Sequence, residues 1–201
     1  VDQTYETLPH CAQPLEPHAT LAHWEGETLH LTTSHQTLRY IQASLRTALG
    51  LAPENVVISA PFVGGGFGSK LAVHADLMGA AIGARMVGQP VKVCLTRQQM
   101  FSLVGMRPWH RQRVRLGADA DGRLTAIGHE VLLYSNERDP FIEQTGIVTR
   151  SLYAGPNRMT RHRVTHLDLP NGEAVRAPGE LPGLLAVETA MDELAEALDM
   201  D

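Results

Sequence analysis

Four glycines in five positions, Gly64-Gly65-Gly66-Phe67-Gly68, constrain this chain more than any other feature. Glycine accepts positive φ angles and lets the backbone approach a neighbour closely, so the segment predicts a tight loop. The apolar run 56–60 before it predicts a buried strand, and the Ala-rich and Met-rich segment 72–87 after it predicts a buried helix. A helix directly after the loop would turn its free N–H groups and positive dipole end toward an anion bound there.

Counting excludes two phosphate-binding motifs for this loop. A P-loop that starts at Gly64 needs glycine where Ser69 stands, and it needs Ser or Thr after its lysine, where Leu71 stands. A dinucleotide fingerprint fails at the same two positions. A tight strand-to-helix turn without a ligand stays an alternative. We expect Phe67 to be buried, which is unusual in a plain linker.

The pattern along the chain predicts an α+β fold with mixed β-sheets and packed helices. Residues 56–96 read as strand, glycine loop, helix and strand, which is a βαβ-like unit. Residues 135–160 have no clean period and predict a long surface segment, and 170–183, with three prolines and three glycines, predict an irregular loop. The other expected elements are a hairpin of strands 16–24 and 27–33, a helix at 36–50, a hairpin at about 111–134, a strand at 162–169 and an amphipathic C-terminal helix at about 184–199.

Length and charge bound the class of protein. The 201 residues allow one sizeable core or two small ones. With 17 Lys and Arg against 22 Asp and Glu, the net charge is −5, so we expect no nucleic-acid partner. No apolar run reaches the roughly 20 residues of a membrane-spanning helix, so we expect a soluble chain without a membrane span.

The cysteines and histidines predict no metal cluster built from side chains. Cys11 and Cys94 are too few for a disulfide framework, a four-cysteine zinc site or a [2Fe–2S] cluster. Ten histidines are spread along the chain. The spacing of His10, Cys11, His18 and His23 matches no helical or CxxC ligand pattern.

Three separated segments resemble the molybdenum-binding subunit of the xanthine dehydrogenase and aldehyde oxidoreductase family. They are Glu-Pro-His-Ala-Thr at 16–20, with Gln36 after the next strand; Val-Gly-Gly-Gly-Phe-Gly-Ser-Lys at 63–70; and Val-Arg-Ala-Pro-Gly-Glu at 175–180. The likeness covers essentially the whole chain. The last segment resembles bacterial aldehyde oxidoreductases more closely than animal xanthine oxidases.

This resemblance implies the first molybdopterin-binding domain of a molybdenum hydroxylase. It implies an oxidoreductase that oxidises aldehydes, purines or other N-heterocycles with water as the oxygen source. The cofactor implied is molybdenum-molybdopterin in its cytosine dinucleotide form, with no amino-acid side chain bound to the metal. The [2Fe–2S] clusters and FAD would lie on partner domains or subunits, in the bacterial cytoplasm or periplasm.

The resemblance also assigns roles to single residues. Gln36 would donate a hydrogen bond to an oxygen on molybdenum, and Gly65, Gly66, Phe67 and Gly68 would line the cofactor. The alternative for Gln36 is an ordinary polar residue at a helix N-terminus.

Arg176 matches the family's arginine beside the metal, and two roles are open for it. Its backbone N–H would contact the metal head, or its planar donors would hold a developing oxyanion. The alternative for Arg176 is a surface ion pair with Glu173 or Glu180.

The family's general-base glutamate lies several hundred residues downstream, and neither Glu180 nor Glu188 matches its motif. We therefore expect residues 1–201 to be a fragment of the molybdenum-binding region, inactive alone, whose partners include the missing C-terminal half of the subunit.

Two further hypotheses compete with this enzyme fragment. One is a non-catalytic anion-binding or nucleotide-binding α+β domain that uses the glycine loop alone. The other is an interaction fragment with a large exposed apolar patch. The enzyme hypothesis predicts that Gly64–Gly68, Gln36 and Arg176 converge on one cleft.

Overall fold

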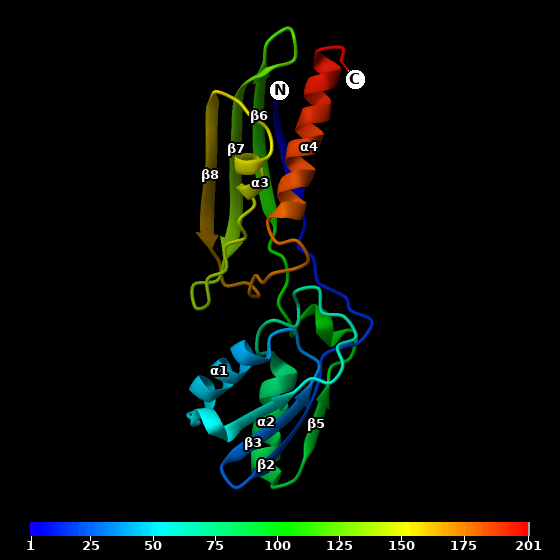
Figure 1. The fold of residues 1–201 in the computed structure, drawn as a ribbon, viewed down its shortest axis with the longest axis vertical. Coiled ribbons are helices and arrows are strands. Elements are labelled where there is room, and N and C mark those ends of the chain that lie inside the picture. The colour runs from blue at the N-terminus through cyan, green and yellow to red at the C-terminus, as the bar shows by residue number, and fades with distance from the viewer. Residues whose placement is uncertain (201) are drawn as a thin grey trace. The chain divides into compact units, whose positions relative to one another are not determined.

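The computed structural model describes residues 1–200 as two compact units. Unit 1 combines Val1–His10 with the chain from Met106 onward, and unit 2 is Cys11–Gly105. Each unit holds one four-stranded sheet with helices packed on it (Figure 1). The predicted α+β class with mixed sheets and packed helices is confirmed. The length allows one sizeable core or two small ones. The structure has a separate main core in each unit.

The sheet of unit 2 has the strand order β4-β3-β2-β5. Strands β2 and β3 form an antiparallel hairpin, β4 runs parallel to β3, and β5 runs antiparallel to β2. The elements of unit 2 are β2 (Ala19–Glu25), β3 (Thr28–Thr33), α1 (Leu38–Leu49), η1 (Pro53–Asn55), β4 (Val56–Ser59), α2 (Ala75–Val87), β5 (Val91–Cys94) and η2 (Gln99–Phe101).

The core of unit 2 lies between its sheet and helices α1 and α2. Alternate side chains of β2 and β3, such as Ala22, Leu29 and Leu31, face the helices and are fully buried. Ile41 and Leu45 of α1 complete the core beside a run of small α2 residues. The opposite face carries polar residues such as His23 and His30 together with the exposed apolar residues Leu21 and Val57.

The sheet of unit 1 has the strand order β1-β6-β7-β8. Strands β1, β6 and β7 are antiparallel neighbours, whereas β8 runs parallel to β7. The elements of unit 1 are β1 (Asp2–Thr7), β6 (His110–Ala118), β7 (Leu124–Ser135), α3 (Ile147–Ser151), β8 (Asn157–His166) and α4 (Glu180–Ala197).

Helix α4 covers one face of this sheet (Figure 1). Its Ala186, Ala190 and Leu194 pack on Val114 and Ile127 of the strands. Helix α4 begins four residues earlier than the predicted 184. None of the described helices is long and apolar enough to cross a membrane.

Pro182 and Gly183, which are typical of an irregular loop, lie instead in the first turn of α4. Pro182 needs no N–H partner there, because the first turn of a helix leaves its N–H groups unpaired. Gly183 lies against the loop before α3, where an added Cβ would come within 2.3 Å of the Thr145 carbonyl oxygen. Glycine at 183 therefore allows a close approach rather than ending the helix.

The prediction of one long surface segment over 135–160 is wrong. It contains the short helix α3, and strand β8 begins at Asn157. The predicted strand at 162–169 is therefore shifted by several residues. Strand β8 is rich in Arg and His and nearly without apolar residues, so its pairing with β7 sets its position rather than a hydrophobic period.

Three further expectations need correction. Helix α2 begins at Ala75 rather than 72, so residues 69–74 separate the glycine loop from its N-terminus. The loop therefore does not lead directly into a helix. Phe67 is 48% exposed rather than buried. Strand β1 was not expected, since its polar sequence has little apolar alternation, and it is a strand because its backbone pairs with β6.

Candidate functional site

Glu16 anchors the start of the glycine loop. One oxygen of its carboxylate accepts the Gly64 N–H at 2.7 Å, the Lys70 ammonium at 2.7 Å and the Ser34 hydroxyl. Burial raises the pKa of Glu16, but the hydrogen bonds from Lys70, Ser34 and Gly64 outweigh it and lower this pKa to about 2. The anchor is therefore a carboxylate at every physiological pH.

Lys70 closes the loop from inside unit 2. Its side chain is fully buried, and its ammonium group donates to the Glu16 carboxylate, the Glu16 carbonyl at 3.1 Å and the Ser34 hydroxyl at 2.9 Å. These three acceptors use all three ammonium protons, which is the condition for burying such a charge. Lys70 is therefore a structural cation and is not placed to bind a ligand.

Gln36 lies beside the second half of the loop. Its side-chain Oε1 accepts the N–H groups of Gly68 at 3.1 Å and Lys70 at 3.4 Å, and its backbone N–H donates to the Lys70 carbonyl at 2.9 Å. The residue is exposed, and helix α1 begins two positions later. Because the side chain bonds the loop, Gln36 is not simply a polar residue at a helix N-terminus. With Oε1 occupied, its amide NH₂ group is the end left to donate.

The close fit between Gln36 and the loop explains the glycine at 66. A Cβ at this position would lie 2.2 Å from Gln36 Oε1, and one at Gly64 would lie 2.5 Å from the Glu16 Cβ. Within the described residues, the N–H groups of Gly65 and Gly66 have no hydrogen-bond partner in the protein. The loop thus presents neutral N–H donors next to the Gln36 amide.

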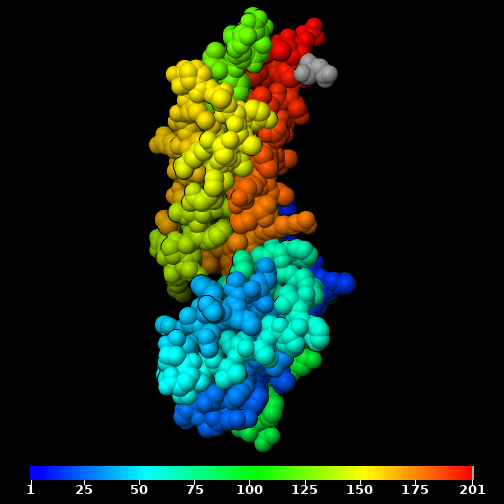
Figure 2. Space-filling view, in the orientation of Figure 1, coloured from blue at the N-terminus to red at the C-terminus, as the bar shows by residue number. Residues whose placement is uncertain are grey.

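Buried polar residues hold the end of the loop at Ser69. The Ser69 hydroxyl contacts His18 Nε2 at 3.2 Å, and its carbonyl oxygen contacts His74 Nε2 at 3.0 Å. Asp76 lies 3.7 Å from His18 and accepts the Thr20 hydroxyl at 2.7 Å. The loop is exposed at its tip and rigidly held at both ends, and its segment reaches the surface of unit 2 (teal in Figure 2).

In unit 1, Arg107 holds the segment that contains Arg176. The buried Arg107 guanidinium donates through Nη2 to the carbonyl oxygens of Val175, of Arg176 at 2.8 Å and of Ala177 at 3.2 Å. It also pairs through Nε with Glu143 at 2.8 Å. Ala177 has a positive φ of 55°, a conformation that needs this kind of support.

Glu143 completes the support for this segment. It accepts the Gly179 N–H at 2.8 Å, and its second oxygen lies 3.3 Å from His110 Nε2. Burial raises the pKa of Glu143, and the bond from Arg107 acts against this rise. Burial also lowers the pKa of His110 to about 4, and the Arg107 charge adds to that effect. His110 is therefore neutral, and Arg107 is the cation that balances Glu143.

The structure brings Gln36 together with Gly65, Gly66, Phe67 and Gly68 in unit 2. Arg176 is an exposed residue of unit 1, so its convergence with the loop stays a prediction.

Sequence reasoning missed the residues that hold these two segments in place. They are Glu16, Lys70, Arg107 and Glu143. Glu16 and Lys70 could have been found, because they lie inside the family motifs at 16–20 and 63–70. Nothing near Arg107 or Glu143 in the sequence marks them as partners.

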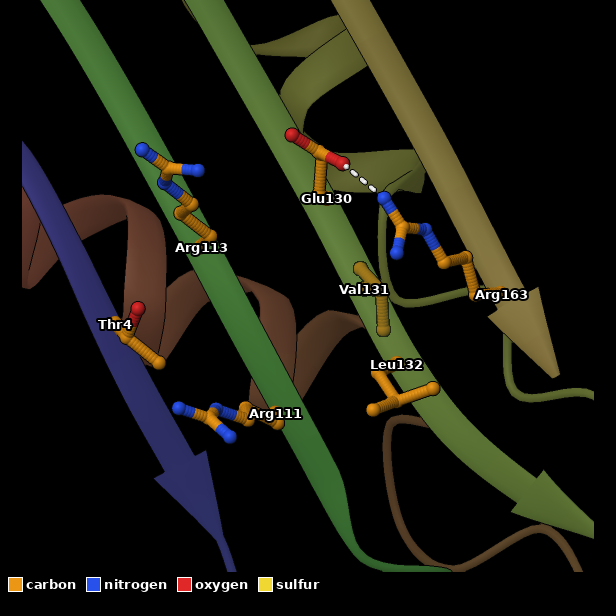
Figure 3. Close-up of a pocket in the computed structure, with 7 residues that line it drawn as sticks. All are labelled: Thr4, Arg111, Arg113, Glu130, Val131, Leu132 and Arg163. Carbon is orange, nitrogen blue, oxygen red and sulfur yellow. Dashed lines mark hydrogen bonds and ion pairs between the residues drawn. The ribbon is translucent and has the colours of Figure 1, made fainter. Parts of the chain in front are cut away.

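A hollow of about 350 Å³ on the outer face of the unit 1 sheet contains none of these residues (Figure 3). Three arginines line it, and each pairs with a carboxylate. Arg113 bonds Asp2, Arg163 bonds Glu130, and Arg111 lies 3.6 Å from Glu6. Because these acids offset the arginines, the hollow is not a candidate anion site.

The geometry defines an α+β domain with an exposed glycine loop that offers neutral N–H donors beside the Gln36 amide. The model of the molybdopterin cofactor-binding domain matches residues 1–201. The chain belongs to this family, which decides against a free-standing anion-binding or nucleotide-binding domain.

Relatives of known class agree with this assignment. The chain is 44% identical to the aldehyde oxidoreductase molybdenum-binding subunit PaoC of Escherichia coli K12, over 100% of the chain and 27% of that subunit. It is 29% identical to the abscisic-aldehyde oxidase of Arabidopsis thaliana, over 93% of the chain and 14% of that protein.

Solved structures give the same fold. All of the chain aligns with 23% of the aldehyde oxidoreductase from Desulfovibrio gigas, with a TM-score of 0.86 and 25% identity. It also aligns with 27% of quinoline 2-oxidoreductase from Pseudomonas putida 86, with a TM-score of 0.92 and 22% identity. The chain therefore spans about a quarter of these bacterial relatives.

The residues around the loop fit a molybdenum-pterin group. Such a group presents oxygen atoms, and the exposed Gln36 amide with the unpartnered N–H groups of Gly65 and Gly66 can donate to them. The carboxylate of Glu16 is held by Lys70 and is not available as a ligand.

Proposed function

We propose that this chain is the first molybdopterin-binding domain of a molybdenum hydroxylase, an oxidoreductase that oxidises aldehydes, purines or other N-heterocycles with water as the oxygen source. One observation supports this most directly: on a chain that matches the family from end to end, the Gln36 amide is fixed against the glycine loop. The molybdenum-pterin group, when bound, supplies the two-electron oxidation.

The part that we assign to unit 2 is to hold and orient that group. Gln36 donates from its NH₂ group to an oxygen on molybdenum, while Gly65, Gly66, Phe67 and Gly68 line the cofactor with backbone groups. The bonds from Gly68 and Lys70 to Gln36 Oε1 fix the direction of the donor before any ligand arrives. Such preorganisation avoids the cost of ordering a flexible amide on binding.

The part that we assign to unit 1 is to present Arg176. Arg107 holds the carbonyl oxygens of residues 175–177, so the Arg176 backbone has a defined course while its side chain is exposed. Arg176 then contacts the metal head through its N–H or stabilises a developing oxyanion through its guanidinium. Arg176→Lys should leave the first role intact and weaken the second, because lysine keeps the charge but lacks the planar donors.

The finer assignments rest on the family resemblance described above. We infer the cytosine dinucleotide form of the cofactor, an aldehyde or N-heterocycle as substrate, and electron transfer to [2Fe–2S] and FAD carriers on partner subunits in the bacterial cytoplasm or periplasm. The remainder of a subunit of the relatives' length would supply the general base and the rest of the cofactor pocket.

Substitution of Gln36 in the full-length molybdenum-loaded subunit tests the proposal. Gln36→Glu keeps the acceptor oxygen that bonds the loop and replaces the NH₂ donor. Gln36→Ala removes both. We expect Gln36→Glu to unfold at the temperature of the unmodified protein but to oxidise aldehyde at least 10-fold more slowly, as loss of one oriented donor predicts. Gln36→Ala should lose stability as well.

The matched control is Gln89→Ala, which alters an exposed glutamine in the turn before β5. It should change neither the rate nor the molybdenum content. Unchanged aldehyde oxidation in both Gln36 variants would refute the assignment.

A further inference from the structure

Three metal-ligating side chains gather on the outer face of the unit 2 sheet. His23 and Glu25 lie on β2, and His30 lies on β3 directly opposite His23 in the antiparallel register. Residues that are directly opposite in an antiparallel pair share one face of the sheet, and residues two apart on a strand do so too. Their neighbours Leu29 and Leu31 face the core, so these three side chains face outward.

The donor atoms of this group lie close together. Nε2 of His23 lies 3.4 Å from one oxygen of Glu25, and Nε2 of His30 lies 3.5 Å from the other. All three donor atoms lie within 4.8 Å of one another. The imidazole rings are stacked at 4.7 Å with planes 13° apart, so the two histidines are held side by side.

These distances are longer than charge-assisted hydrogen bonds and are compatible with a shared ion. Charge-assisted hydrogen bonds between imidazolium and carboxylate are about 2.7–2.9 Å long, and neither contact is that short. Ligands bound tetrahedrally to zinc at about 2.0–2.1 Å lie about 3.4 Å apart. Each histidine Nε2 lies at about that distance from one of the two Glu25 oxygens.

The hairpin that carries the group is fixed from its inner side. Trp24 donates its indole N–H to the Ala81 carbonyl of α2 at 2.9 Å. Arg85 of α2 stacks on the Trp24 ring at 4.7 Å and donates to the Gly26 carbonyl at 2.8 Å and to Glu27 at 2.8 Å. With both the strand and its turn held, the backbone that carries the three ligands is ordered before an ion binds.

We propose that His23, Glu25 and His30 form a surface site for a divalent ion of the zinc class. Two imidazoles and one carboxylate suit zinc and neighbouring transition ions, and disfavour calcium and magnesium, which prefer oxygen donors. Three protein ligands leave one tetrahedral position for water. The site does not depend on the molybdenum cofactor, since none of its residues belongs to the glycine-loop region.

Titration of the purified protein with Zn²⁺ tests this inference, after dialysis against a chelator. Calorimetry and atomic absorption should give one additional zinc ion per chain. His23→Ala and His30→Ala should each weaken zinc binding at least 10-fold, as loss of one of three ligands predicts. Zinc at saturation should raise the melting temperature of the unmodified protein but not that of His30→Ala.

The control is His166→Ala, which removes an exposed histidine at the end of β8. It should bind zinc as the unmodified protein does. The inference fails if no zinc binds, if both hairpin variants bind it unchanged, or if His166→Ala weakens binding as much as they do.

Discussion

At the scale of single residues, the glycine loop depends on close approach more than on flexibility. Gly66 lies so near Gln36 that a methyl group cannot fit between them, and the Gln36 oxygen is already held by two backbone N–H groups. The position of the Gln36 amide therefore requires glycine at 66.

Gly66→Ala should displace the Gln36 amide, because the new Cβ would lie 2.2 Å from its oxygen. We expect a loss of about 1–2 kcal/mol in the free energy of unfolding. In the loaded subunit we also expect aldehyde oxidation to fall at least 10-fold. Urea unfolding and the rate assay measure the two effects.

Gly79→Ala is the control for this substitution. Gly79 lies inside α2, and its added Cβ would meet only a Val93 methyl group at 3.7 Å. Alanine in a helix should raise stability by about 0.5–1 kcal/mol. If Gly66→Ala behaves like Gly79→Ala, the close fit is not what requires the glycine.

The sequence predicted Gln36 and the loop glycines because they lie inside one local pattern and a family motif. It could not predict Arg107 and Glu143, which are 36 positions apart. The segment that they support lies 69 positions from Arg107 at Arg176 and 36 positions from Glu143 at Gly179. Such a buried pair is set by the tertiary fold, and neither residue has a distinctive sequence neighbourhood.

At the scale of elements, the segment before α4 relies on one side chain. Arg107 binds three consecutive carbonyl oxygens and Glu143, so it replaces the hydrogen bonds that a helix or strand would have supplied to residues 175–177.

Arg107→Ala should leave the buried Glu143 without its cation and cost about 3–5 kcal/mol in the free energy of unfolding. Arg107→Lys keeps the charge but lacks the planar fork, so it should recover only part of that loss. Chemical denaturation gives the two values, and hydrogen exchange reports on residues 175–179. Wild-type stability and protection in Arg107→Ala would contradict this account.

The strands could be predicted where apolar residues alternate, and less well where pairing alone fixes them. Strands β2, β3 and β6 follow a period of two. Strands β1 and β8 are polar, and they are strands because β6 and β7 provide backbone partners. No local pattern gives that information.

At the scale of the whole molecule, buried neutral histidines make stability depend on pH. Burial lowers the pKa of His129 to about 4, against 6.5 in an unfolded chain. Between pH 6.5 and 4 the unfolded chain therefore binds the proton and the folded chain does not. Stability falls as the pH is lowered through that window.

Each such histidine contributes up to about 1.4 kcal/mol per pH unit. His110, whose pKa is also about 4, acts in the same direction. We expect the free energy of unfolding, measured in urea at pH 7, 6 and 5, to fall with this slope. His129→Asn should reduce the slope of the unfolding free energy against pH by the contribution of one histidine. His166→Asn should leave this slope unchanged. Equal slopes in all three proteins would show that His129 does not titrate in this way.

The central claim concerns the molybdenum-pterin head and the residues around it. A crystal structure of the full-length protein loaded with molybdenum tests it most directly. We predict that the Gln36 amide donates to an oxygen on molybdenum, that the loop at Gly65–Gly68 lines the cofactor, and that Arg176 lies beside the same head. A cofactor bound elsewhere, with Gln36 and Arg176 both facing solvent or other protein, would contradict the claim.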